Sequence, residues 1–201
     1  NPSGRGNRTL RAELAGVEVG EGLPVRVMAA INVSPESFYS ASVARTRRAL
    51  AARVRQAATE GADFIDLGAM STAPYRRTWI AEEEERKRLV AAVQVASGES
   101  DLPVSVDTQR AAVAEAALAA GARIVNDVSG LAADPRMGEV VRQAEGVILM
   151  AHEEGPSHEP PLRLVRRLLR ACLARARRAG IAAQRIVLDP GIGFFRQAFV
   201  P

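Results

Sequence analysis

The alternation of two kinds of segment along the 201-residue chain constrains its fold more than any other feature. Short runs of apolar and β-branched residues are each followed by a longer segment rich in Ala, Arg, Glu and Leu. Continuous apolar runs are typical of strands that are buried on both faces. The six runs lie at residues 25–32, 63–68, 103–108, 123–130, 146–152 and 185–191. The pattern therefore predicts a series of βα units built on a parallel sheet.

The segments between these runs are predicted to be helices. They cover residues 43–59, 81–96, 110–119, 135–143 and 162–179. Gly61, Gly121 and Gly180 follow three of them, at the position where a left-handed residue commonly ends a helix. A run of four glutamates at 82–85 favours a helix N-terminus, because acids there interact well with the helix dipole. Residues 9–24, which precede the first unit, are predicted to form a small hairpin with a glycine turn.

Six βα units in series fit either an open doubly wound sheet or a (β/α)₈ barrel. The glycine fingerprint of dinucleotide-binding sheets does not follow the first strand, which counts against dinucleotide binding. Nearly every apolar run ends in polar residues, namely Asn32, Asp66, Asp107, Asn126, Asp127, His152 and Asp189. Parallel barrels build their active sites at this end of their strands. We therefore expect a TIM barrel with its site there, although any single strand-end Asp is equally consistent with a helix cap.

Composition argues against several classes of function. The chain has 27 basic and 23 acidic residues, and the basic ones are spaced as solvent-facing sides of helices. Neither a clustered basic stripe nor a reading motif is present, so nucleic-acid binding is not expected. No apolar run reaches about 18 residues, and the N-terminus is not apolar, so we expect a cytoplasmic protein without a membrane span or signal peptide. Cys172, the single cysteine, is expected to be a small core residue.

The strand-end residues suit a flat heterocycle. The Asn126 amide offers a donor and an acceptor, and a carboxylate can accept two parallel hydrogen bonds from an amino-pyrimidinone edge. Met150 and Phe194 are candidates for the ring faces, with a core position as the alternative for each.

The chain resembles the dihydropteroate synthase family of pterin-binding TIM barrels, nearest to its divergent archaeal-type branch. The resemblance rests on six motifs in the family's order, INVSPESF, GADFIDLGAMSTAP, PVSVDT, AGARIVNDVSG, VILMAH and LDPGIGF. It implies a (β/α)₈ barrel in which the pterin is bound by Asp107, Asn126, Asp189, Met150 and Phe194. It further implies that Asn32 lies near the substrate diphosphate and its Mg²⁺, and that Thr72 belongs to the diphosphate loop.

The implied reaction condenses a 6-hydroxymethyl-dihydropterin diphosphate with p-aminobenzoate, or a related aromatic amine, in a cytoplasmic enzyme that is commonly a homodimer. Two departures stand out. Ala73 replaces the arginine of the family's STRP motif, and Arg76 or Arg77 is a candidate substitute. Only about six of eight βα units are present, so residues 1–201 are expected to be one truncated barrel domain, with the family's lysine and later basic residues beyond Pro201.

Two alternative functions remain open at this point. A pterin-dependent methyltransferase would pass a methyl group from a folate to a corrinoid. The NVSPESF motif favours the synthase, because its asparagine serves a diphosphate that a methyl transfer lacks. The third interpretation is a non-catalytic pterin-binding protein.

Overall fold

The structure, a computed structural model, describes residues 10–33, 43–70, 80–152 and 157–192. A parallel sheet is formed by β3 (Met28–Asn32), β4 (Phe64–Gly68), β5 (Val104–Asp107), β6 (Ile124–Asp127), β7 (Gly146–Met150) and β8 (Ile186–Asp189). The helices are α1 (Val43–Thr59), α2 (Glu82–Glu99), α3 (Ala111–Ala119), α4 (Met137–Val141) and α5 (Pro161–Arg178), with a short 3₁₀ turn, η2, at Ala183–Arg185. An antiparallel hairpin, β1 (Arg11–Leu14) and β2 (Val17–Gly20), comes first.

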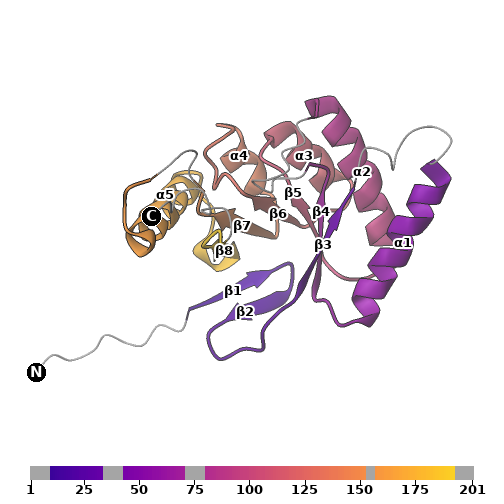
Figure 1. Cartoon of the computed structure of the whole chain (residues 1–201), viewed down its shortest axis with the longest axis horizontal. Helices are drawn as coiled ribbons and strands as arrows, with labels where there is room; N and C mark the ends of the chain where they lie inside the picture. Colours follow the sequence, from indigo (N-terminus) through magenta and orange to yellow (C-terminus); the bar gives the residue numbers. More distant parts are fainter. Residues whose placement is uncertain (1–9, 34–42, 71–79, 153–156, 193–201) are drawn as a thin grey trace, which may run out of the picture.

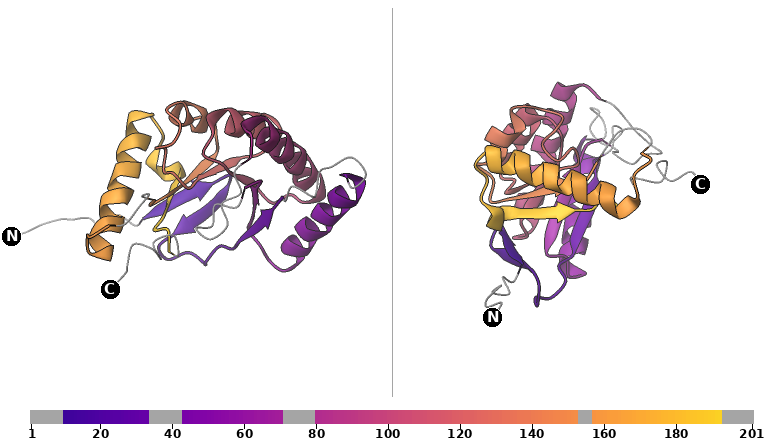
Figure 2. Two further views of the ribbon diagram at one scale, coloured as in Figure 1. Left: turned by 45° about the horizontal axis from the view of Figure 1, so that its top comes forward. Right: turned by 90° about the vertical axis from the view of Figure 1, so that its left-hand side faces the viewer.

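The order of the strands decides between the two predicted architectures. The six strands lie side by side in the order in which they occur in the chain, and each pair is parallel. A doubly wound sheet would reverse direction at a switch point, and this one does not. Figures 1 and 2 show the helices arrayed in an arc along one side of the sheet, with the hairpin on the other side. This is the layout of consecutive βα units in a TIM barrel, as predicted.

Successive residues of a strand belong to two different apolar clusters, one on each face of the sheet. Ile65 and Leu67 of β4 belong to the large cluster that the helices cover. Phe64, on the opposite face of β4, packs with Leu14 of the hairpin and with Ile124 and Ile148. The second cluster therefore lies inside the curved sheet, where the hairpin covers it.

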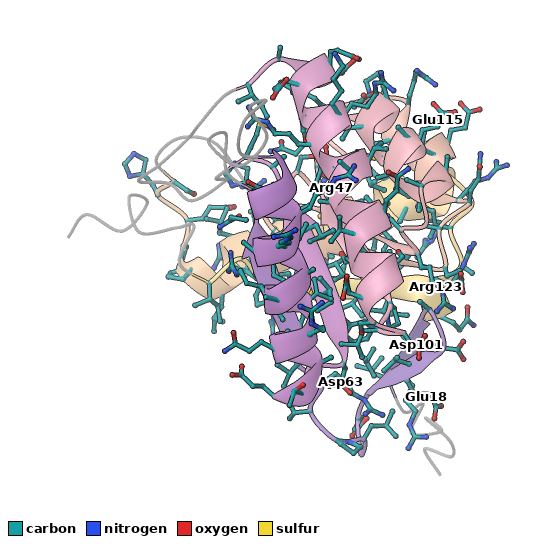
Figure 3. All side chains as sticks on the ribbon, turned by 90° about the vertical axis from the view of Figure 1, so that its right-hand side faces the viewer. Glu18, Arg47, Asp63, Asp101, Glu115 and Arg123 are labelled. Atoms are coloured by element: carbon teal, nitrogen blue, oxygen red, sulfur yellow. The ribbon has the colours of Figure 1, made fainter. Side chains whose placement is uncertain are left out.

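The hairpin marks the end of the sheet at which the strands begin. Figure 3 shows Glu18 of the hairpin at the same end of the molecule as Asp63, Asp101 and Arg123, which all precede strands. The carboxylate of Asp63 accepts hydrogen bonds from the Val27 N–H (2.7 Å) and from Arg26 Nη1 (3.1 Å). Because the Val27 N–H bonds to the Asp63 side chain, it does not join the strand ladder. This explains why β3 starts at Met28 and not at the beginning of the apolar run.

Most local predictions are confirmed. Gly61, Gly121 and Gly180 have φ angles of 91°, 118° and 74°, as expected for residues that end helices. Cys172 is buried in the core at 1% exposure. The helix predicted at 135–143 is shorter than expected, because α4 spans five residues. Among the described residues, no helix is long and apolar enough to cross a membrane.

Candidate functional site

One row of residues crosses the carboxyl-terminal ends of four strands. The parallel register pairs Asn32 with Gly68, Gly68 with Asp107, and Asp107 with Asn126. Paired residues in a sheet point to the same face, and this face also carries Phe64 and therefore looks into the barrel. Asn32 is exposed, whereas Asp107 and Asn126 are half-buried. Three residues predicted from sequence are thus brought together at the barrel mouth.

Gly68 leaves a small open space within this row. A Cβ atom placed on Gly68 would lie 3.4 Å from Asn32 Oδ1 and 3.6 Å from Asp107 Oδ2. Both side chains therefore lean over the glycine, with oxygen atoms turned toward one small space. A larger residue at position 68 would fill that space, so the glycine keeps it open to a ligand.

Met150 and Asp189 form a second pair in register, on β7 and β8. Met150 is 2% exposed and shares the inward face of β7 with Ile148. Asp189 is half-buried, and its Oδ1 accepts the Gly191 N–H at 2.7 Å. Gly191 has a φ of 69°, a conformation in which glycine is favoured. The turn after β8 therefore holds the Asp189 carboxylate in place through Oδ1. This bond does not use the second oxygen, Oδ2.

The adjacent residues Asn126 and Asp127 lie in different environments, because successive residues of a strand point to opposite faces of the sheet. Asp127 is fully buried on the side of the helices. Its Oδ1 accepts the N–H (2.8 Å) and the hydroxyl (2.7 Å) of Ser129, and its Oδ2 accepts the Leu131 N–H at 2.9 Å. Asp127 thus holds the turn after β6 and takes no part in the mouth, although it stands in the predicted strand-end series.

Asp66 is a further candidate site residue, to which the sequence analysis gave no role. It lies on β4, two residues before Gly68 and on the same inward face, and it is 9% exposed. Asn126 Nδ2 donates to Asp66 Oδ2 at 3.1 Å, which fixes the orientation of the Asn126 amide. The second oxygen, Oδ1, is buried and makes no hydrogen bond of ordinary length within the described part of the chain. The sequence signal that could have identified Asp66 is its spacing of two residues from Gly68, which places both on the same face of β4.

Burial determines the ionisation of Asp66. Removal from water raises the pKa of Asp66 above its ordinary value of 3.8, and the nearby Ser105 hydroxyl and Asn126 amide only partly oppose this. The folded protein therefore binds a proton at Asp66 more tightly than the unfolded chain does.

Replacement of Asp66 by Asn is expected to raise the free energy of unfolding at pH 7 by on the order of 1 kcal/mol, because it removes a buried charge. Since the pKa of Asp66 is raised in the folded state, wild-type stability falls as the pH rises from 3.8 through the raised pKa. The advantage of the variant should therefore grow across this window and vanish at more acidic pH. Urea unfolding at several pH values measures it, with exposed Asp101→Asn as the control. A difference that does not depend on pH would contradict the prediction.

Two predicted site residues, Thr72 and Phe194, lie outside the described residues, as do Ala73, Arg76 and Arg77. His152 follows β7 and is half-buried. Within the described ranges, no group of three or more His, Cys, Asp or Glu side chains gathers as a set of metal ligands.

The fold and the mouth together define a βα-barrel chain whose polar strand ends face one shared space. The model of the pterin-binding enzyme family matches residues 28–199, and the chain belongs to this family.

Relatives within the family carry a more particular name. The chain is 33% identical to a dihydropteroate synthase of Clostridium beijerinckii over 169 residues, which are 84% of this chain and 62% of that protein. It is 32% identical to the Bacillus subtilis dihydropteroate synthase, with 84% and 59% covered. The chain thus spans less than two thirds of the length of these curated relatives.

Solved structures give the same picture. Xanthomonas albilineans dihydropteroate synthase with 4-aminobenzoic acid superposes with a TM-score of 0.78 and 36% identity, covering 92% of this chain and 68% of that one. The Burkholderia cenocepacia dihydropteroate synthase complexed with 7,8-dihydropteroate gives a TM-score of 0.75 at 32% identity, with 92% and 65% covered. The predicted fold, a dihydropteroate synthase-like TIM barrel, is confirmed, and the part of the chain that the structure describes contributes six parallel strands and five α-helices.

Proposed function

We propose that the protein containing this chain is a dihydropteroate synthase, which joins a 6-hydroxymethyl-dihydropterin diphosphate to p-aminobenzoate. The observation that carries the proposal is the row of Asn32 on β3, Asp107 on β5 and Asn126 on β6, which are in register through Gly68 of β4 and face one mouth. The similarity to synthases whose structures hold 4-aminobenzoic acid and 7,8-dihydropteroate supports the choice of both substrates. We further propose that residues 1–201 form one pterin-binding barrel domain.

In this proposal, the pterin ring is recognised by hydrogen bonds to its edges. Asp107 and Asp189 are acceptors for the N–H groups of the amino-pyrimidinone edge, as charge-assisted bonds. The Asn126 amide donates one N–H to Asp66, so its oxygen and its second N–H are left for the ligand. Met150 and Phe194 pack against the faces of the ring. Asp66 therefore contributes by fixing which end of the amide the pterin meets.

The diphosphate is assigned to the side of the mouth near Asn32, with Thr72 in the loop that contacts it. Asn32 Oδ1 faces the open space above Gly68, beside Asp107 Oδ2. Oxygen donors of this kind suit Mg²⁺, which commonly binds few protein ligands together with substrate phosphates and water. The residues present therefore fit a Mg²⁺ held by Asn32 and the diphosphate itself. Such an ion neutralises charge that builds on the leaving diphosphate.

The residues of the mouth contribute by placing the reacting carbon. A pterin held along its edge by Asp107, Asn126 and Asp189 keeps its methylene group in one position for an aromatic amine. The C–O bond to the diphosphate breaks, a bond forms from the amine nitrogen to the methylene carbon, and the nitrogen loses a proton to solvent. The enzyme forms no covalent bond to the substrate.

The remaining expectations belong to the same proposal. We infer a cytoplasmic homodimer that takes small-molecule substrates and binds neither nucleic acid nor membrane. Light scattering of the purified protein measures its mass, and a monomeric mass would remove the dimer from the proposal.

The intact protein is expected to form dihydropteroate from pterin diphosphate and p-aminobenzoate in the presence of Mg²⁺. Chelation of the metal should abolish product formation, because the leaving diphosphate would lose its counter-charge, and added Mg²⁺ should restore it. Chromatography of the product against a synthetic standard measures the reaction. Intact pterin binding with no product above background would refute the synthase, and methyl transfer from a methylated folate to a corrinoid would replace it.

A further inference from the structure

A buried ionic cluster lies directly behind the pterin-facing end of β5. The Glu85 cluster consists of Glu85 on α2 together with Thr108 and Arg110, which connect β5 to α3. Glu85 is 0% exposed, and Thr108 is 2% exposed. Glu85 Oε1 accepts the Thr108 hydroxyl at 2.6 Å, and Glu85 Oε2 accepts Arg110 Nη1 at 2.6 Å. A charged residue buried so completely requires such partners, because an unpaired buried carboxylate would be strongly destabilising.

The cluster joins two segments that are distant in the chain, the start of α2 and the connection from β5 to α3. Arg110 Nη2 also donates to the carbonyl of Ile80 at 3.0 Å, immediately before α2 begins. The Arg110 N–H donates to the Thr108 hydroxyl at 3.2 Å, so this hydroxyl both accepts and donates. Directional hydrogen bonds fix how far α2 can slide along β5, whereas apolar packing alone would tolerate small shifts. The cluster thus sets the position of the strand end relative to the helix.

Thr108 connects this cluster to two candidate pterin contacts. It follows Asp107 in the chain, and its N–H donates to the Asn126 carbonyl at 3.2 Å. The side chain of Thr108 is thus fastened to α2, while its backbone is fastened to β6. A shift of Thr108 would move Asp107 and change its spacing from Asn126, and small misplacements in a binding site have large effects.

We propose that Glu85 is a positioning residue for pterin recognition, which acts through Thr108 to hold Asp107 and Asn126 at their binding distance. The inference rests on the proposed function, because it assigns Asp107 to the pterin. Glu85 itself does not touch the substrate in this account. Its contribution is the placement of β5.

The test compares Glu85→Gln with Glu84→Gln in the intact protein. Glu84 is the matched control, because it stands next to Glu85 on α2 and pairs with the buried Arg88 at 2.6 Å, but this pair stays within one helix. Titration with 6-hydroxymethylpterin, followed by fluorescence, measures affinity per folded molecule. We expect Glu85→Gln to weaken binding about 10-fold, with the KM for p-aminobenzoate unchanged, and Glu84→Gln to leave both unchanged.

A double-mutant cycle separates positioning from general stability. If Glu85 acts through Asp107, then Glu85→Gln should cost little further affinity in an Asp107→Asn background. Additive losses, or equal affinities for the two glutamine variants, would overturn the proposal. If Glu85→Gln does not fold, Thr108→Ser, which keeps the hydroxyl, should retain affinity that Thr108→Val loses, and equal affinities of those two variants would overturn it. Wild-type protein that binds no pterin would instead refute the proposed function.

Discussion

Asp189→Asn is expected to lower kcat/KM for the pterin diphosphate about 10³-fold, which corresponds to about 4 kcal/mol. A carboxylate can accept hydrogen bonds at both oxygens, and in Asp189 one oxygen is already used by the Gly191 N–H at 2.7 Å. An asparagine has one acceptor oxygen and an NH₂ group, so it must turn donors toward either the Gly191 N–H or the N–H groups of the pterin. Either choice replaces an attraction between charge and donor with a clash of two donors.

The experiment measures steady-state kinetics and pterin affinity of the variant. Asp63→Asn is a suitable control, since it makes the same chemical change at the opposite end of a strand, near the hairpin (Figure 3). The control should keep wild-type kinetics. A thermal melt shows that each variant is folded. If Asp189→Asn kept pterin affinity within threefold of wild type, the assignment of Asp189 to the ring edge would be wrong.

Leu14→Asp is expected to lower the free energy of unfolding by at least about 4 kcal/mol. Leu14 is 2% exposed and packs with Phe64, Ile124 and Ile148 at the hairpin-covered end of the sheet. It also contacts β7 closely, because a Cβ atom on Gly146 would lie 2.5 Å from Leu14 Cδ2. An aspartate in this place would bury a charge with no partner and leave apolar neighbours without their contact.

Urea unfolding of the intact protein measures this loss, with Leu10→Asp as the control. Leu10 lies just before the same hairpin and is 79% exposed, so its replacement should change stability by less than about 0.5 kcal/mol. Equal unfolding midpoints for the two variants would show that the hairpin does not contribute to the core. A selective loss at Leu14 would show that the hairpin is an integral part of the barrel.

The predicted elements were recovered because their signals are local. Apolar runs of strand length and glycines after helices depend on neighbours in the chain, and Gly61, Gly121 and Gly180 have the expected backbone. The four glutamates at 82–85 were interpreted as dipole partners of a helix start, and they do occupy the first turn of α2. The same pattern could not reveal that Glu85 is buried against Arg110, because that contact spans 25 residues of sequence.

The candidate site shows the same division. Strand-end polar residues could be identified from the sequence. Whether each side chain points into the barrel or toward the helices depends on the register of its strand, which the sequence did not show. Asn126 turns into the mouth while Asp127 supports a turn on the other side of the sheet. Asp66 was visible as a strand-end acid, yet its bond to Asn126 joins residues 60 positions apart.

The amino-acid sequence by itself determined the βα series, the end of the sheet that carries polar residues and the family resemblance, since these depend on composition and order along the chain. Only the tertiary structure decided the sequential strand order, the grouping of Asn32 and Asp107 over Gly68 with Asn126 next to Asp107, and the burial of Asp66 and Glu85. These features arise from strand register and from packing between distant segments. A side chain's neighbours across a sheet are set by that register, and no local pattern specifies it.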